Sequence, residues 1–156
     1  ALHFACCYGA ENLSVVTYLV EIAGLGVHTR TNRGTTPLNL AAESDGRNTD
    51  TLRYLVENQE ADLHLTDEEG RTPLYMAFSR RRSSSNPNAE YLLSRMESVD
   101  EKVLSIAFKC RIPWSVKKTV LEKYAAGQGQ SEQLATSPVH MPSIQAFKEC
   151  IVNFPL

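Results

Sequence analysis

The sequence has no long apolar run and no excess of charge of either sign. None of its hydrophobic stretches approaches the roughly 18 consecutive apolar residues that a membrane-spanning helix requires. Its 16 lysines and arginines nearly balance 18 aspartates and glutamates, which leaves a formal net charge of −2. A chain with this balance has no general affinity for nucleic acid or for anionic membranes. We therefore expect neither a nucleic-acid partner nor a membrane partner.

Motifs that mark common catalytic and cofactor sites are also absent from the sequence. It contains no Gly-x-x-x-x-Gly-Lys-Ser/Thr phosphate loop, no dinucleotide glycine fingerprint, no His-Glu-x-x-His and no Gly-x-Ser-x-Gly. Acidic residues are plentiful, but none is paired with a histidine or cysteine at a spacing typical of catalysis. We therefore predict no catalytic, cofactor-binding or metal site, and we interpret the chain as a binding protein.

Cysteine is scarce and is not arranged for metal binding. The four cysteines are Cys6, Cys7, Cys110 and Cys150, and they form no Cys-x-x-Cys pair and no metal-ligand spacing with a histidine. Such cysteines are typical of buried, reduced thiols, which favour a reducing compartment. We therefore expect a cytoplasmic protein, with the nucleus as an alternative location.

What the sequence does have is a motif that recurs through most of its length. Residues 32–42 read Asn-Arg-Gly-Thr-Thr-Pro-Leu-Asn-Leu-Ala-Ala, and residues 69–77 repeat this as Glu-Gly-Arg-Thr-Pro-Leu-Tyr-Met-Ala. A truncated copy opens the chain at residues 1–5, and a degenerate copy occurs at residues 104–107. The leucines of the first three copies are 36 residues apart, and the fourth follows after 30 residues. Periods of about 20–50 residues indicate stacked structural repeats.

Each full copy has the residues of a tight turn followed by a short helix. Gly34 can adopt a positive φ at the tip of a hairpin. Thr36 can cap a helix whose first residue is Pro37, where the missing N–H does no harm. A second apolar stripe, which includes Leu52 and Leu55, indicates a second helix in the unit. Because neither helix can bury its apolar face alone, the units must stack on one another.

Three features of the sequence resemble the ankyrin repeat: the Gly-x-Thr-Pro-Leu-x-x-Ala motif, the Leu-Val or Leu-Leu pair of the second helix, and the closing Glu-Ala-Asp-Leu-His of residues 60–64. The resemblance is specific over residues 1–98, weak over residues 99–126 and absent after that. It implies an all-α fold, an ankyrin-repeat solenoid of stacked helix-turn-helix units with β-hairpin-like loops. The repeat domain then spans residues 1–126, with three clear repeats at about 1–31, 32–66 and 67–98 and a degenerate, capping fourth at 99–126.

Both ends of the chain depart from the repeat pattern. Glycine and glutamine follow the fourth repeat, and we place a flexible linker at residues 127–142. Ser143 can then cap a helix over residues 143–154, whose apolar residues recur at three- and four-residue steps. This helix either packs on the fourth repeat or serves as a further element or a partner-binding helix. At the other end, Ala1 stands where a repeat has its proline, so we expect the chain to start within a repeat.

The resemblance implies a non-enzymatic protein-interaction domain, an adaptor or scaffold, that binds its partner through the hairpin tips and first helices on a concave face. Carried over position by position, that surface comprises Cys7, Tyr8, Asn32, Arg33, Thr35, Glu43, Ser44, Glu68, Glu69, Arg71, Ser79 and Arg80. The charges on it are mixed, which favours a protein partner with a matching charge pattern over a polyanion. We expect a monomer without a cofactor.

Two other functions remain open on the sequence. The chain could be the regulatory ankyrin domain of a larger enzyme whose catalytic part lies outside these residues. It could instead bind nucleic acid through the arginines at 80–82 and the lysines at 117–118. In that case binding would weaken steeply as the salt concentration rises.

The third copy carries an insertion between its two expected helices. Residues 80–88 read Arg-Arg-Arg-Ser-Ser-Ser-Asn-Pro-Asn, a polar run typical of a solvated loop. The run is either a tolerated insertion or a substrate for a kinase that prefers basic sequences. In the second case Ser83, Ser84 or Ser85 would carry the phosphate, which could order the loop beside the arginines.

Overall fold

The computed structural model describes residues 1–8, 13–44, 48–79, 86–110 and 112–131. Over these residues the chain forms helices and no strands. The helices are α1 (Leu2–Tyr8), α2 (Leu13–Glu21), α3 (Pro37–Glu43), α4 (Thr49–Glu57), α5 (Pro73–Ser79), α6 (Pro87–Arg95), α7 (Glu101–Lys109) and α8 (Trp114–Ser131).

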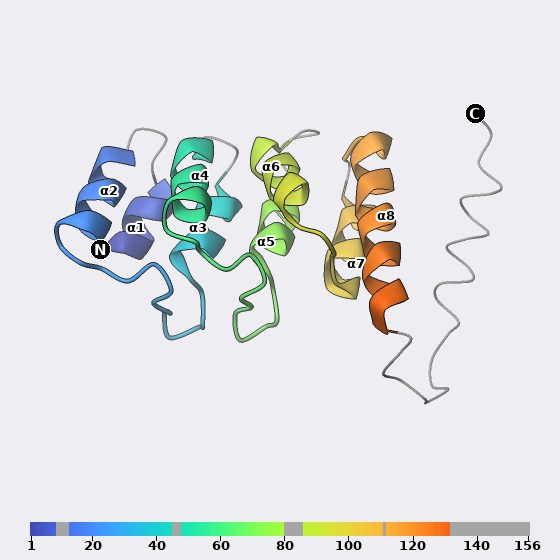
Figure 1. Cartoon of the computed structure of the whole chain (residues 1–156), viewed down its shortest axis with the longest axis horizontal. Coiled ribbons are helices and arrows are strands. Elements are labelled where there is room, and N and C mark those ends of the chain that lie inside the picture. The colour runs from blue at the N-terminus through green and yellow to red at the C-terminus, as the bar shows by residue number, and fades with distance from the viewer. Residues whose placement is uncertain (9–12, 45–47, 80–85, 111, 132–156) are drawn as a thin grey trace.

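Consecutive helices form antiparallel pairs, and the four pairs stand side by side in one row (Figure 1). The first helices of the pairs, α1, α3, α5 and α7, contact one another in order along the row. The second helices, α2, α4, α6 and α8, do the same on the other side. The predicted all-α solenoid of stacked helix-turn-helix units is therefore confirmed.

The loops that lead into α3 and α5 both project from the same side of the row (Figure 1). Gly34 has a φ of 71° at the tip of the first loop, a region that favours glycine. Below this tip the N–H of Thr31 donates to the carbonyl of Thr35 at 3.0 Å. The second loop is built in the same way around Gly70, with a φ of 69°. These loops have hairpin-like hydrogen bonds without forming strands, and we call them the first tip (residues 30–35) and the second tip (residues 66–71).

Polar side chains cap the helices that the motif was expected to start. Thr36 Oγ1 accepts a hydrogen bond from the N–H of Asn39 at 3.3 Å, with proline at the first helical position. In the fourth repeat, which lacks Thr-Pro, Asp100 takes over this function. Its Oδ1 accepts from the N–H of Val103 at 2.7 Å. The degenerate repeat therefore still begins its first helix with a capped turn.

The apolar core lies where the first helices face the second helices. The largest fully buried apolar side chains are those of Leu38, Leu52, Leu55, Leu74 and Leu92. Burial of each such leucine contributes about 1.5–3 kcal/mol relative to exposure. Ala41 and Ala42 are both 0% exposed and allow close approach to α3. The core is therefore spread evenly along the row, and each repeat contributes to its neighbours.

The last helix is longer than the sequence predicts. α8 continues to Ser131, so residues 127–131 are helical, and the prediction of a linker that begins at residue 127 is wrong. A Cβ at Gly127 would lie 3.0 Å from the Cβ of Ser98, so glycine permits close packing here. The rest of the predicted linker, residues 132–142, and the predicted helix at 143–154 lie outside the described residues.

No disulfide joins the cysteines of the described residues. Cys6 is buried, whereas Cys7 and Cys110 are half-buried. Burial, with a smaller contribution from Cys7, raises the pKa of the Cys6 thiol to about 12. Cys6 is therefore protonated at neutral pH and acts as a packing residue. Cys150 lies outside the described residues.

Candidate functional site

Most of the predicted partner-binding residues lie on the two tips and at the ends of the first helices. We call this surface, formed by the two tips and the exposed side of α1, α3, α5 and α7, the first-helix face. The exposed predicted residues are Tyr8, Asn32, Arg33, Glu68 and Glu69, and the half-buried ones are Cys7, Glu43, Ser44, Arg71 and Ser79. Arg80 and the predicted phosphorylation sites Ser83, Ser84 and Ser85 lie outside the described residues.

Thr35 is the predicted contact residue that the structure places in the interior. It is only 7% exposed. Its N–H donates to Thr31 Oγ1 at 3.2 Å, and its carbonyl oxygen accepts from His3 Nε2 at 3.2 Å. These bonds close the first tip and tie it to α1. The prediction that Thr35 contacts a partner is therefore wrong, because its polar groups are used within the fold.

The second tip is built around the buried carboxylate of Asp67. This carboxylate accepts from the N–H groups of Glu69 at 3.0 Å and Arg71 at 2.8 Å, and from Arg71 Nε at 2.7 Å. Burial opposes ionisation of Asp67, but the hydrogen bonds and charge of Arg71 outweigh it and hold the pKa of Asp67 below its usual range. Arg71 also forms an ion pair with Glu69 at 3.0 Å. The second tip is therefore held in one shape by charged groups.

We expect Asp67→Ala to lower the free energy of unfolding by about 1–2 kcal/mol at pH 7, because the N–H groups and the guanidinium lose their acceptor. Asp67→Thr is the matched variant, since Thr31 Oγ1 caps the equivalent N–H groups of the first tip. It should recover part of the loss. The folded-state pKa of Asp67 is depressed, so its stabilisation is present above the unfolded pKa of about 3.9 and is lost as the pH falls through the folded pKa.

Urea unfolding of the wild type and both variants at pH 7 and pH 2 measures these effects. The difference between wild type and Asp67→Ala should shrink at the lower pH. An Asp67→Ala variant as stable as the wild type at pH 7, or a difference that grows on acidification, would contradict the assigned network.

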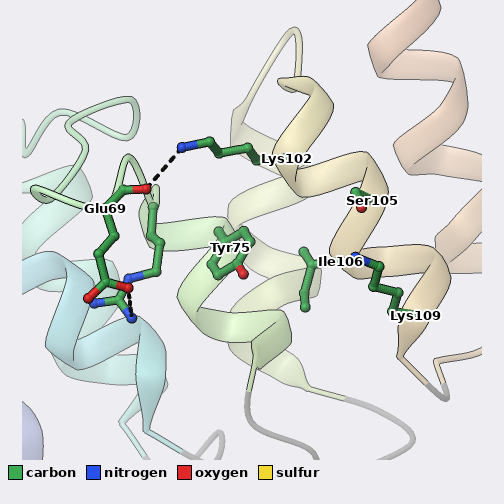
Figure 2. Close-up of a pocket in the computed structure, with 7 residues that line it drawn as sticks. Glu69, Tyr75, Lys102, Ser105, Ile106 and Lys109 are labelled. Carbon is green, nitrogen blue, oxygen red and sulfur yellow. Dashed lines mark hydrogen bonds and ion pairs between the residues drawn. The ribbon is translucent and has the colours of Figure 1, made fainter. Parts of the chain in front are cut away.

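A hollow of about 260 Å³ lies between the second tip and α7 (Figure 2). It is smaller than the roughly 300–1,000 Å³ of typical small-molecule sites and fits about one side chain. Its lining residues come from three consecutive elements of the first-helix face: Glu69 and Arg71 from the second tip, Tyr75 from α5, and Lys102, Ser105, Ile106 and Lys109 from α7.

The α7 side of the hollow carries positive charge without a balancing carboxylate. Lys102 Nζ donates to the backbone carbonyl of Glu69 at 2.9 Å, which keeps the ammonium at the rim (Figure 2). Lys109 is exposed about two helical turns further along α7. In the part of the chain that the structure describes, neither lysine forms an ion pair, so both charges remain available to a partner.

The opposite side of the hollow is electrostatically different. Burial opposes the charged form of Arg71, but the hydrogen bond and charge of Asp67, followed by the charges of Glu69 and Glu43, raise its pKa. Arg71 therefore stays positively charged, and the acidic residues around it balance that charge. The structure thus brings together three predicted contact residues, Glu43, Glu69 and Arg71, and places them next to two unpaired lysines that the sequence did not predict.

Sequence reasoning missed the α7 residues because the fourth repeat lacks the hairpin glycine and the Thr-Pro turn. It was interpreted as a cap, so none of its residues was assigned to the binding face. A usable signal was present, since Lys102, Ser105 and Lys109 recur at three- and four-residue steps and so share one helical stripe. That stripe faces the second tip.

The described residues hold no group of three or more histidine, cysteine, aspartate or glutamate side chains that could bind a metal ion. Over the same ranges, no helix combines the length and the apolar character needed to cross a membrane.

Comparison with known proteins identifies the family. A family model described as ankyrin repeats in three copies matches residues 2–103, well over half of the chain. The chain belongs to the ankyrin-repeat family. Ankyrin repeats are protein-interaction modules whose stacked units form extended binding surfaces. No curated protein matches this ankyrin chain.

Among solved structures, this ankyrin chain is similar to a chain of the complex between the predatory endopeptidase Bd0816 of Bdellovibrio bacteriovorus and the immunity protein Bd3460. The TM-score is 0.62 and the identity is 24%, over 80% of this chain and 63% of that chain. At this identity the similarity shows the fold alone. The ankyrin chain therefore spans less than two thirds of the length of that structural neighbour.

Proposed function

We propose that this ankyrin chain is a non-enzymatic adaptor or scaffold domain that binds a protein partner on the first-helix face, with the hollow between α5 and α7 as its anchor point. The observation that carries this proposal is the set of hydrogen-bond donors around the hollow. Within the described residues, Tyr75 Oη, Ser105 Oγ and Lys109 Nζ form no hydrogen bond, and Lys102 Nζ has only a backbone acceptor.

The chemistry of the hollow fits an acidic side chain of the partner. A carboxylate accepts hydrogen bonds from lysine and from hydroxyl groups, and such charge-assisted bonds are stronger than neutral ones. Glu69 lines the other side of the hollow. Together with Glu68 beside it in the chain and Glu43, whose charge acts on Arg71, it favours a basic group of the partner. A partner that places an acidic residue on α7 and a basic residue near α3 would match the charge on both sides of the hollow. These two charge pairs would fix the orientation of the partner on the first-helix face. In this proposal the domain is a cytoplasmic monomer and needs no cofactor.

The test is a double charge reversal in the hollow, Lys102→Glu with Lys109→Glu. The matched control reverses two basic residues of the second helices, Arg95→Glu with Lys118→Glu, which changes the net charge equally. Partners are captured from the native source on the wild-type chain, and their affinity for each form is then measured. We expect the hollow variant to bind at least about tenfold more weakly, equivalent to about 1.4 kcal/mol, and the control to change affinity less than about twofold.

Unchanged affinity in the hollow variant, or an equal loss in both variants, would contradict the proposal. Exposed charges contribute little to stability, so circular dichroism and thermal unfolding should show all three forms folded with similar midpoints.

A further inference from the structure

The large apolar side chains that are exposed in the described part of the chain gather at one end of the stack. Seven of the eight belong to α1, α2 and the segment that follows α2. They are Phe4, Tyr8, Leu13, Val15, Tyr18, Ile22 and Leu25. Because α1 and α2 form the end of the row (Figure 1), neither helix has a neighbouring pair on its outer side. A concentration of exposed large apolar side chains at one end of a fold is typical of an interaction site.

The positions that correspond to Phe4 and Val15 are more buried in the repeats that have a preceding neighbour. Phe4 is 67% exposed, whereas Met76, two repeat periods later, is 5% exposed. Val15 is 46% exposed, whereas Thr51, one period later, is 1% exposed. The difference arises because α5 packs against α3 and α4 packs against α2. At these two positions, the outer side of α1 and α2 therefore corresponds to surface that a preceding repeat covers in the later repeats.

Among the second helices, one tyrosine–glutamate hydrogen bond joins α4 to α2 and another joins α6 to α4. Tyr54 Oη donates to Glu21 Oε1 at 3.0 Å, and Tyr91 Oη donates to Glu57 Oε1 at 2.9 Å. In both cases the acceptor belongs to the preceding repeat, 33 or 34 residues earlier. Burial, and then the bond to the glutamate, raises the pKa of both tyrosines, to about 12 for Tyr91. These hydroxyls therefore remain donors at any physiological pH.

Tyr18 continues this series at the exposed end. It precedes Tyr54 by one repeat period of 36 residues and occupies the same place in its helix. Within the described residues its hydroxyl forms no hydrogen bond, and the residue is 59% exposed. Its expected acceptor is a glutamate on a repeat ahead of α1.

We infer that the outer side of α1 and α2 is the stacking interface for a further ankyrin-type helix pair, joined ahead of α1 in the same polypeptide. The second helix of that pair carries a glutamate that accepts a hydrogen bond from Tyr18. Burial of Phe4 and Val15 supplies the stabilisation, and the Tyr18 bond fixes the register. The occupant belongs to the same polypeptide because an isolated helix pair cannot bury its apolar face and does not fold alone.

A second copy of this chain, stacked end to end, fits the surface less well. Leu121 of α8 corresponds to Leu19 of α2, so the position that corresponds to Glu21 is Lys123. Lys123 Nζ donates to the carbonyl of Met96 at 2.6 Å. A lysine cannot accept the hydrogen bond from Tyr18, and the end formed by α8 therefore lacks the acceptor that the series requires.

The chain itself supplies a probe for this interface. Residues 32–72 contain most of the first tip, α3, α4 and the second tip, and they end on Thr72, which precedes the first residue of α5. In the probe, this segment is fused directly ahead of Ala1. The added segment continues for 15 residues after its copy of Glu57, and Tyr18 is the eighteenth residue after the junction. The added glutamate then precedes Tyr18 by the 33 residues that separate Glu21 from Tyr54.

The experiment compares thermal unfolding of the 156-residue chain and of the fusion, each with and without Tyr18→Phe. We expect the fusion to unfold in one transition with a raised midpoint. Tyr18→Phe should lower the midpoint of the fusion by about 2–4 °C and leave the midpoint of the chain alone within about 1 °C. Phe4→Asp is the second variant, and it should likewise be destabilising only in the fusion. Tyr54→Phe is the control and should lower both midpoints.

Three results would overturn the inference. One is a fused segment that unfolds in a separate transition at lower temperature. Another is a Tyr18→Phe effect of equal size in the chain and in the fusion. The third is sedimentation of the 156-residue chain as a dimer that Tyr18→Phe or Phe4→Asp dissociates, since the surface would then bind a second copy.

Discussion

Leu55→Ala is expected to lower the free energy of unfolding by about 2–5 kcal/mol, the range for truncation of a fully buried leucine. Leu55 lies in α4 and is 0% exposed, near the middle of the stack. The variant loses the transfer free energy of the side chain and leaves a cavity among short helices that cannot close it without moving their neighbours. Because α4 packs against α2, α3 and α6, the loss weakens three repeats together.

Urea unfolding followed by circular dichroism measures this effect. Leu13→Ala is the matched control, since it makes the same chemical change at a position of α2 that is 36% exposed. It should cost less than about 1 kcal/mol because its side chain is already partly solvated. Similar losses in the two variants would show that Leu55 is not a central core residue of the stack.

Asn88→Ala is expected to cost about 2–3 kcal/mol, because it removes several buried hydrogen bonds to another repeat. Asn88 lies in α6 and is 0% exposed. Its Nδ2 donates to the carbonyl oxygens of Ala41 and Ser44, each at 3.1 Å. Its Oδ1 accepts from the hydroxyl of Thr49 at 2.9 Å. One amide therefore satisfies the end of α3 and the start of α4.

Asn88→Leu separates the loss of hydrogen bonds from the loss of volume. Leucine fills approximately the same space but cannot bond to the two carbonyl oxygens, so we expect Asn88→Leu to remain destabilised by at least about 1 kcal/mol. Equilibrium unfolding in urea of the wild type and the two variants at pH 7 measures this. Full recovery of stability in Asn88→Leu would show that only packing matters at this position.

The elements that local chemistry determines were predictable from the sequence. Gly34, Thr36 and Pro37 act on their own turn and on the next few residues, so the tip and the helix start follow from the motif alone. The 36-residue period then requires stacking, since no single helix pair can bury its apolar face. These signals gave the fold class and the order of the helices.

The features that sequence reasoning missed depend on contacts between repeats. Thr35 is buried because His3, 32 residues earlier, bonds to its carbonyl oxygen. The hollow exists because α7 brings Lys102 to the carbonyl of Glu69, 33 residues away. Gly127 lies within α8, where it closely approaches Ser98, 29 residues earlier. None of these pairs has a local signature. Composition therefore predicted a linker at residue 127, and the ankyrin resemblance placed Thr35 on the binding face.

The most direct test of partner binding on the first-helix face is site-specific photo-crosslinking from two exposed serines. Ser105 lies in the hollow on α7, and Ser94 lies on α6 among the second helices. A photoreactive amino acid is placed at one position or the other, and the chain is irradiated with the partner that the wild type captures. The account predicts a crosslinked product from position 105 and little or none from position 94. Crosslinking from position 94 without crosslinking from position 105 would contradict it.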